Sequence, residues 1–368
     1  EKKFFITEEQ VVTPAEILMG AFTDADKIYI NGICCGSSYD RYASRIYPVA
    51  PGILRAGENV VCIHLYVFRG RGGAMPGKQY GIRFKKGKER WLDLSGTWDA
   101  QIRKQMEYLP EKTFFNYMAS AMFNGMISPV SPYKICAVIY YQGESDVGHP
   151  NRYALEFRAL VNDWRKSWKE KQLPIIYVQL AGFSDGNIKK QGTQWAEFRE
   201  VQRQAMEIEN TAMVQAYDVG EYNDLHPMDK KALGMRAALA VHKLVYGEKE
   251  ECTGPQVRKI RLDRDKRVYA VFDQPLQTGS KKDGCELVSE VELRKANGDY
   301  KRAYVTVDGN EICAWLSDGE EPTGIRYAWK DCPMNICLYG KRGLPVIPFI
   351  KEWGRDAIYT GKICETDR

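Results

Sequence analysis

Two short polar blocks in this chain carry residue types that could perform acyl-transfer chemistry. The first reads YYQGESD at residues 140–146, and the second reads NDLHP at residues 223–227. Each block follows an apolar run that predicts a buried strand. Polar side chains just past the ends of parallel strands point into the crevice where open α/β sheets bind ligands. We therefore expect the two blocks to meet in one site.

His226 is the candidate general base. Ester hydrolysis needs a group that takes a proton from a nucleophile near neutral pH, and the unperturbed pKa of imidazole suits this task. His226 lies in a polar turn before a proline, where neither helix formation nor core packing requires a histidine. Asp224 is the nearest carboxylate that could hold the imidazole tautomer. Asp218, Glu221 and Glu144 are alternatives for this orienting role.

Gln142 and Gly143 are candidate oxyanion donors, through a side-chain amide and a backbone N–H. Removing one such donor typically costs on the order of 100- to 1000-fold in rate. The alternative is that both residues only form a hydrogen-bonded turn at a strand end. Glu144 either contacts the substrate or is a buried carboxylate that supports this loop. We expect the functional atoms of His226 and Gln142 to lie within about 10 Å of each other.

A nucleophile is harder to find in this sequence. Ser145 follows the first glycine of a strand-to-helix nucleophile elbow, but the second glycine is missing. Serine near a helix start is more often a cap. Ser37 and Ser38, in a strand-rich region, are weaker candidates still. We therefore predict that residues 1–368 alone do not hydrolyse acetyl esters.

The two polar blocks resemble those of the sialate O-acetylesterase-like carbohydrate esterases of the SGNH hydrolase superfamily. That family is marked by a (W/Y)-Y-Q-G-E-S-(N/D) block and a later D-(L/I)-H-P block. Four further stretches share the resemblance: FNGMISP at 123–129, QLA at 179–181, WAEFREVQ at 195–202 and IRYAW at 325–329. The family's nucleophilic serine lies in a G-Q-S-N-M block, which does not occur between residues 1 and 368.

The resemblance implies acyl transfer to a serine, with His226 as base and Gln142 in the block that provides an oxyanion donor. Asn124 and Gly125 match the Asn-Gly of the family's second block, and either line the acyl pocket or serve helix packing. The wider superfamily places its acid three residues before the histidine, and Asn223 stands there. The implied substrate is an acetylated glycan or sialic acid, the implied location is periplasmic or secreted, and no cofactor is implied.

Two explanations fit the missing serine. In the first, an upstream segment of the same polypeptide carries it, and the whole is a carbohydrate O-acetylesterase. In the second, the chain is a non-catalytic carbohydrate-binding relative with an inactive esterase core. Reading the gene upstream of Glu1 for a serine block would distinguish them.

Composition excludes several other classes. The net charge of +5 is spread over interspersed acidic and basic residues, which does not indicate a nucleic-acid groove. No apolar run reaches the ~18 residues needed to span a bilayer, and the first residues lack signal-peptide features. Four histidines, without paired CxxC or HExxH motifs, make a zinc site improbable. We expect most of the ten cysteines to be buried free thiols.

The chain divides into three predicted regions. Residues 1–100 show short strands and Gly-rich turns typical of a β-sandwich, resembling the jelly-roll insert of this esterase family. Residues 101–250 alternate strands and helices, which indicates an α/β domain with a parallel sheet. The resemblance implies that this domain is of the SGNH or flavodoxin-like type. Residues 251–368 return to short strands and predict a small β-domain, in which Trp329 lies either at the site rim or in the core.

The predicted parallel sheet is incomplete. Continuous apolar strands are expected at 136–141, 174–180 and 211–217, with helices at about 150–168, 195–208 and 228–246. The strand that should carry the nucleophile is missing from this series. Because a central parallel strand is covered on both edges, we expect a gap beside the strand at 136–141.

Overall fold

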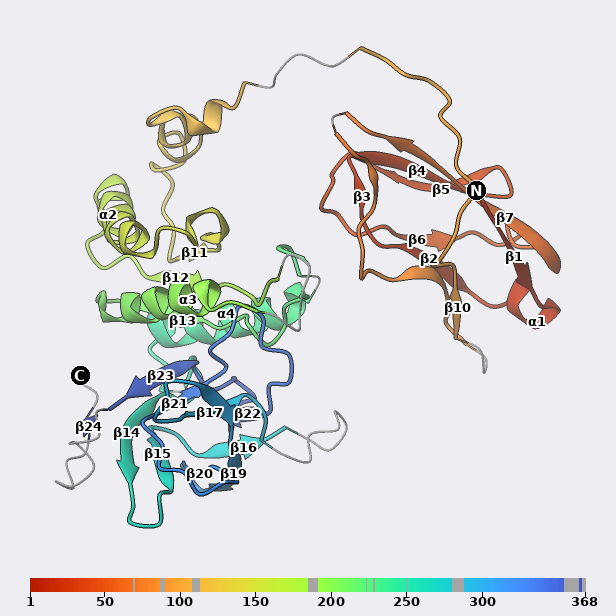
Figure 1. Ribbon diagram of the computed structural model, residues 1–368. Helices are drawn as coiled ribbons and strands as arrows, with labels where there is room; N and C mark the ends of the chain where they lie inside the picture. The colour runs from red at the N-terminus through yellow and green to blue at the C-terminus, as the bar shows by residue number, and fades with distance from the viewer. Residues whose placement is uncertain are drawn as a thin grey trace. The chain divides into compact units, whose positions relative to one another are not determined.

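The computed structural model describes residues 1–68, 70–86, 90–107, 113–184, 191–222, 224–227, 229–249, 251–279 and 288–353, and the backbone of 364–365. Figure 1 shows the chain, which is mixed α/β, with antiparallel sheets and one parallel sheet. Contacts divide it into two compact units, Glu1–Phe114 and Phe115–Arg368, which we describe separately. The three-domain boundaries of the sequence analysis stay a prediction.

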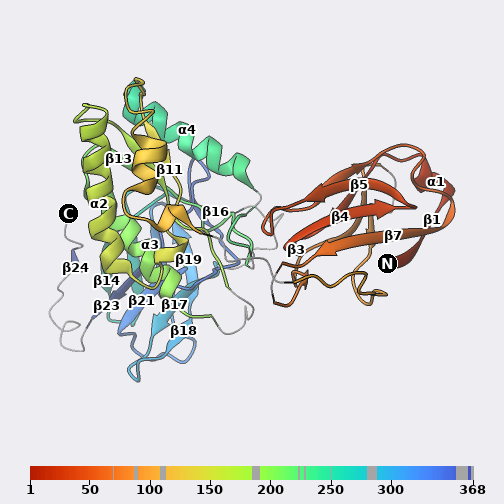
Figure 2. The same ribbon diagram turned by 90° about the horizontal axis from the view of Figure 1, so that it is seen from above.

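The first unit consists mainly of two four-stranded antiparallel sheets. One sheet has the order β1 (Lys2–Ile6), β7 (Gly57–Tyr66), β4 (Ala25–Ile30) and β5 (Ile33–Ser38), and Figure 2 shows β4, β5 and β7 side by side. The other has the order β10 (Trp91–Asp93), β9 (Tyr80–Phe84), β2 (Ala15–Met19) and β6 (Ile46–Val49). The short pair β3 (Phe22–Thr23) and β8 (Gly73–Ala74) and helix α1 (Glu8–Val11) complete the unit.

A single core lies between these two sheets. Alternate residues of each strand enter it, for example Ile28 and Ile30 from β4 and Ile82 and Phe84 from β9. This alternation follows from the two-residue repeat of a strand, which sends successive side chains to opposite faces. The short strands predicted for residues 1–100 are confirmed, for example by β4, β7 and β9.

The second unit begins with a parallel sheet of order β11 (Val138–Tyr140), β12 (Ile175–Val178) and β13 (Thr211–Val214). Between the strands lie α2 (Pro150–Ser167) and α3 (Gln194–Gln204), and α4 (Lys230–Tyr246) follows β13. Short helical turns are η1 (Phe115–Tyr117), the π-helix η2 (Phe123–Ile127), η3 (Glu144–Asp146) and η4 (Ala205–Glu207). The predicted strand and helix order of this region is confirmed.

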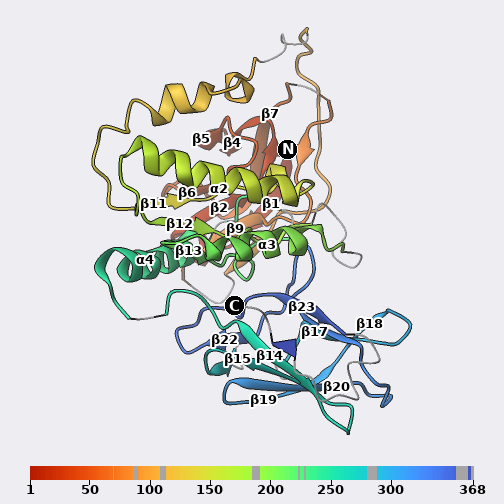
Figure 3. The ribbon, with the colours of Figure 1, turned by 90° about the vertical axis from the view of Figure 1, so that its left-hand side faces the viewer.

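Helices cover both faces of the parallel sheet, as Figure 3 shows for α2 and α4. Ile175 and Tyr177 of β12 pack with α2 and α3, whereas Ile176 and Val178 pack with α4. Helix α2 begins with Pro150. Proline is favoured there because the N–H groups of the first turn have no acceptor within the helix, so no hydrogen bond is lost. Helix α4 ends at Gly247, whose φ of 72° suits a left-handed cap.

Strand β11 is the exposed edge of this sheet. Among the described strands it pairs with β12 alone. Ile139 of β11 is 58% exposed, whereas its partner Ile176 on β12 is fully buried. The described part of the chain thus leaves the other edge of β11 without a paired strand, as the incomplete series of strands predicts.

The remaining strands of the second unit are antiparallel. One sheet has the order β19 (Tyr304–Asp308), β20 (Glu311–Trp315), β15 (Val268–Phe272), β14 (Val257–Leu262) and β24 (Cys364–Glu365). Another has the order β18 (Tyr300–Arg302), β17 (Val291–Arg294), β21 (Gly324–Tyr327) and β23 (Phe349–Glu352), and β16 (Leu276–Thr278) pairs with β22 (Leu338–Gly340).

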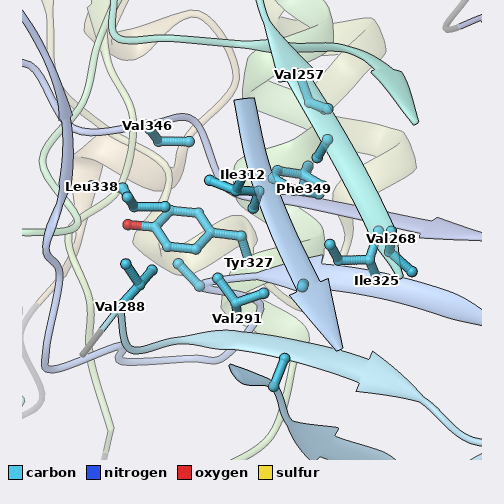
Figure 4. Close-up of a cluster of buried hydrophobic side chains, with 14 of the residues drawn as sticks. Val257, Val268, Val288, Val291, Ile312, Ile325, Tyr327, Leu338, Val346 and Phe349 are labelled. Carbon is cyan, nitrogen blue, oxygen red and sulfur yellow. The ribbon is translucent and has the colours of Figure 1, made fainter. Parts of the chain in front are cut away.

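These strands enclose a core around Tyr327, shown in Figure 4 among Val291, Leu338 and Val346. The core continues into the helical part, because Tyr217, which follows β13, belongs to it. The Tyr217 hydroxyl donates to the carbonyl of Val346. Trp329 is 6% exposed, which places it in the interior rather than at a rim.

The described cysteines are all free thiols. Three of the eight are buried, Cys252, Cys332 and Cys337, and the others are partly or fully exposed. The expectation that most are buried is wrong, because several cysteines lie on strand faces turned to solvent. Within the described residues, no helix is both long enough and apolar enough to cross a bilayer.

Candidate active site

The carboxyl ends of β11, β12 and β13 lie at one edge of the sheet, because the three strands are parallel. Two contacts tie the loops that follow them. The ammonium of Lys230, at the start of α4, lies 5.1 Å from the centre of the Tyr141 ring. The N–H of Ser184, after β12, donates to the carbonyl of Tyr222, after β13, at 2.5 Å. The structure thus brings the two polar blocks to one sheet edge.

Gln142 is held in a fixed orientation by two neighbours in its own loop. Its Oε1 accepts from the Tyr140 hydroxyl at 2.9 Å, and its Nε2 donates to Oδ2 of Asp146 at 2.7 Å. A carboxylate only accepts hydrogen bonds, so this pairing fixes which end of the amide is the donor. Nε2 carries two N–H groups, and the second remains for another acceptor. Gln142 can therefore take part in the hydrogen-bonded turn at the strand end and still donate its second N–H to an oxyanion.

Burial keeps the two tyrosines of this block protonated. It raises the pKa of Tyr141 to about 12, with the charge of Glu144 as a smaller cause. Burial likewise raises the pKa of Tyr140 above its ordinary value. A protonated Tyr140 donates its hydroxyl hydrogen to Gln142 throughout the neutral range, which stabilises the amide orientation.

Gly143 occupies a position that other residues cannot take easily. Its φ is +147°, and a Cβ there would lie 2.7 Å from a ring carbon of Phe198 on α3. The close approach of α3 therefore requires glycine. In the described part of the chain, the N–H of Gly143 donates to no intramolecular acceptor. This N–H is a suitable oxyanion donor beside Gln142.

His226 is exposed, in the turn between β13 and α4, and Asp224 is buried. Oδ1 of Asp224 accepts from the backbone N–H of His226 at 2.8 Å. Short Asp side chains commonly stabilise turns through such bonds to the backbone two residues on. The contact positions the backbone of His226, and with it the Cα atom that carries the imidazole side chain.

The alternative carboxylates differ in their partners. Both oxygens of Asp218 accept from the guanidinium of Arg236 at 2.7 Å, and both side chains are largely buried. This bidentate pair attaches α4 to the end of β13 and occupies Asp218. Glu221 accepts through its carbonyl from the N–H of Asp224 at 3.0 Å. Asn223 lies outside the described residues.

Glu144 and Ser145 lie in the η3 turn after Gly143, where Glu144 is half-buried and Ser145 is exposed. Asn124 and Gly125 lie in η2, and both are exposed. Among the described residues, no atom comes within 4 Å of a Cβ built on Gly125, so no described neighbour requires glycine there. Both roles considered for Asn124 and Gly125 stay predictions.

The sequence analysis missed a buried connection between α3 and the loop after β21. Arg199 is fully buried, and its Nη1 donates to the carbonyl of Asp331 at 3.1 Å. Burial lowers the pKa of Arg199 to about 10. Oδ1 of Asp331 accepts from the N–H of Trp195 at 2.9 Å, in the first turn of α3. The sequence contains a hint of this contact. Arg199 lies in the block at 195–202, and Asp331 follows the block at 325–329 by two residues.

Metal ligands do not gather in groups of three or more anywhere in the part of the chain that the structure describes. The titratable groups at this sheet edge are instead Asp, Glu, His and Tyr side chains that follow parallel strands. A shared site of these groups with the donors of Gln142 and Gly143 stays a prediction.

Residues 100–243 match the family model of carbohydrate esterases described as sialic acid-specific acetylesterases. Human sialate O-acetylesterase is 28% identical over 63% of this chain and 48% of its own length. The mouse sialate O-acetylesterase is 31% identical over 63% of this chain and 47% of its own length. The chain thus spans about half the length of these curated relatives.

A solved structure gives the same result. The crystal structure of a carbohydrate acetylesterase from Xanthomonas citri superimposes with a TM-score of 0.57 and 29% identity, covering 63% of this chain and 53% of that one. The matched segment 100–243 contains both polar blocks and all three parallel strands. Through its central segment, this chain is similar to the sialate O-acetylesterase-like carbohydrate esterases.

Proposed function

We propose that this chain supplies the base and the oxyanion donors of a carbohydrate O-acetylesterase that hydrolyses acetyl esters on glycans such as sialic acids. His226 takes the proton of a serine nucleophile and returns it to the leaving sugar hydroxyl. Asp224 orients His226, and Gln142 and Gly143 stabilise the tetrahedral oxyanion. Glu144, Asn124 and Gly125 contact the substrate.

The observation that carries this proposal is that both polar blocks follow parallel strands at one sheet edge, where Lys230, just after the second block, contacts the Tyr141 ring. Beside the oriented amide of Gln142, the N–H of Gly143 donates to no acceptor among the described residues. We expect both donors to face the carbonyl group under attack. Acetylated glycans are the corresponding substrate class, and we propose a periplasmic or secreted location, where such glycans are exposed.

We place the nucleophilic serine on a segment outside residues 1–368. The exposed edge of β11 supports this, because a strand added there in parallel would end beside Gln142. Its last residues could then present a hydroxyl to the oxyanion donors and to His226. The addition would also cover part of the exposed apolar surface of β11.

The first test uses purified residues 1–368 with 4-nitrophenyl acetate and with O-acetylated sialic acid. We expect no turnover above buffer and no labelling by a fluorophosphonate, since the base has no hydroxyl to activate. Stoichiometric fluorophosphonate labelling with turnover would contradict the external serine. The variant Ser145→Ala would then show whether Ser145 is the nucleophile.

The second test uses a longer polypeptide that joins residues 1–368 to a segment with the serine block. We expect His226→Ala to lower acetyl-ester turnover at least ~100-fold, the lower range for general acid-base assistance. The matched control is His242→Ala, because His242 is exposed on α4 and pairs with Glu248. Equal activity of both variants would show that His226 is not the base. An inactive longer polypeptide would favour the non-catalytic carbohydrate-binding alternative.

A further inference from the structure

The first unit contains a hollow that the proposed esterase chemistry does not use. Its volume is about 450 Å³, and it is lined by Gln79, Arg83, Phe84, Lys85, Arg90 and Trp91. Binding sites for small molecules typically measure roughly 300–1,000 Å³, so the hollow is large enough for a sugar ring. It lies where β9 and β10 pair, and all its lining residues belong to the first unit.

Trp91 and Arg83 face away from the core. They are directly opposite each other on β10 and β9, so both side chains lie on the same face of the sheet. The neighbouring residues Ile82 and Phe84 are buried in the core. By the strand alternation, Arg83 therefore points to the solvent face, and Trp91 points there with it.

The Trp91 indole packs on the backbone of Gly81. A Cβ on Gly81 would lie 2.5 Å from Cζ2 and 2.8 Å from Cη2 of Trp91. The ring therefore covers the glycine backbone and is held against the sheet. Trp91 nevertheless remains 40% exposed. Such an indole presents a flat apolar surface, and the C–H face of a pyranose can stack on it while the sugar hydroxyls remain accessible at the edge.

Cationic groups surround this surface and are held in place. Nη2 of Arg83 bonds Oε2 of Glu16 at 2.9 Å, and the Lys85 ammonium bonds Oε1 of the same carboxylate at 3.0 Å. Both cations remain about half exposed. A guanidinium has five N–H donors, and the bond to Glu16 uses one. Arg90 also lines the hollow, so three of its described lining residues are cationic.

We propose that this hollow binds an acidic pyranose, with its ring stacked on Trp91 and its carboxylate bound by Arg83. Lys85 and Arg90 add positive charge at the same end, and Gln79 can bond the sugar hydroxyls. The indole and the cations together favour a ligand that has both an apolar sugar face and a negative charge. A neutral sugar lacks the charge, and a simple anion lacks the apolar face. This second site is independent of the proposed esterase function.

The test is a titration of purified residues 1–368 with methyl glucuronide and with the methyl glycoside of N-acetylneuraminic acid. Neither probe carries an acetyl ester, so hydrolysis cannot interfere. We expect saturable binding with a Kd on the order of 1 mM, by calorimetry and saturation-transfer NMR. Methyl glucoside and inorganic phosphate should each bind at least about tenfold more weakly.

Substitutions test separately the two contacts of the proposed site, the sugar ring on Trp91 and the carboxylate at Arg83. Trp91→Ala should weaken binding of the acidic sugar at least about tenfold, and Trp91→Phe should restore part of it. Arg83→Ala should remove the preference for the acidic over the neutral sugar. The controls are Tyr39→Ala and Arg55→Ala, because both side chains are exposed in the same unit and neither lines the hollow.

Three results would overturn the proposal. One is the absence of binding by either acidic sugar at concentrations well above the expected Kd. Another is equal weakening by the control variants. The third is binding of phosphate as tight as that of the sugars and insensitive to Trp91→Ala, which would indicate a simple anion site. Circular dichroism of each variant checks that the fold is retained.

Discussion

At the scale of single residues, the loop after β11 is determined by Gly143 and Gln142. The amide of Gln142 is fixed by Tyr140 and Asp146, and Gly143 permits the turn that follows. Tyr140 donates to the carbonyl end of the amide, and Asp146 accepts from the NH₂ end, so both bonds favour the same orientation. The orientation of the Gln142 amide thus depends on two side chains of its own loop.

The variant Gly143→Ala tests this role of the backbone. Its added Cβ would meet the Phe198 ring at 2.7 Å in a conformation that L-residues rarely adopt. We expect a loss of about 1–3 kcal/mol in the free energy of unfolding, from backbone strain alone. Gly148→Ala is the matched control, because a Cβ there meets no atom within 4 Å. Urea denaturation of both variants measures the difference, and equal losses would show that the turn tolerates a side chain.

At the scale of elements, the parallel sheet is asymmetric. Strand β12 is buried along its whole length, whereas β11 exposes its middle residue. Helix α4 is attached firmly at the other side through Arg236 and Asp218. The edge strands of the described sheet are β11 and β13, and only β11 exposes its middle residue, so we expect another strand to be added beside β11.

Truncation of two paired isoleucines measures this asymmetry. Ile176→Ala, at a fully buried site, should cost about 2–5 kcal/mol in the free energy of unfolding. Ile139→Ala, at a site 58% exposed, should cost less than about 1 kcal/mol in residues 1–368. If both variants lose the same stability, the β11 face is covered in solution. In the longer polypeptide, we expect the cost of Ile139→Ala to rise.

At the scale of the whole molecule, each unit has a core of its own, and the second unit joins two kinds of sheet. Gln215, just after β13, is one of the polar connections between them. Its Nε2 donates to the carbonyl of Pro345 at 2.5 Å, and its Oε1 accepts from the N–H of Gly254 at 2.9 Å. We infer that the parallel and antiparallel parts of this unit unfold together.

The variant Gln215→Leu removes both bonds while keeping a similar volume. It leaves two buried backbone groups unpaired, each at a cost of about 1–3 kcal/mol. We expect a lower free energy of unfolding, with the two sheets of the second unit still opening together, followed by circular dichroism and by hydrogen exchange of both sheets. Gln204→Leu is the control, because the exposed side chain of Gln204 bonds Glu200 and no other described residue. Different free energies of opening for the two sheets of the second unit, measured by hydrogen exchange in the unaltered chain, would contradict the coupling.

The sequence by itself determined the type and order of the elements in the central region. Apolar runs without alternation predicted buried parallel strands, Pro150 marked a helix start, and the blocks at 140–146 and 223–227 indicated the candidate site. These features depend on local periodicity and on residue type, which a sequence displays directly. The open edge beside β11 followed from the same series of strands.

Only the tertiary structure decided which partners these residues have. It assigned Asp218 to Arg236, gave the Asp224 carboxylate to the His226 backbone, and buried Arg199 against the loop at Asp331. It also placed Trp91 over Gly81 beside Arg83 and Glu16. Such contacts join residues that are distant in the chain or depend on exact turn geometry, and hydrophobic periodicity contains no information about either.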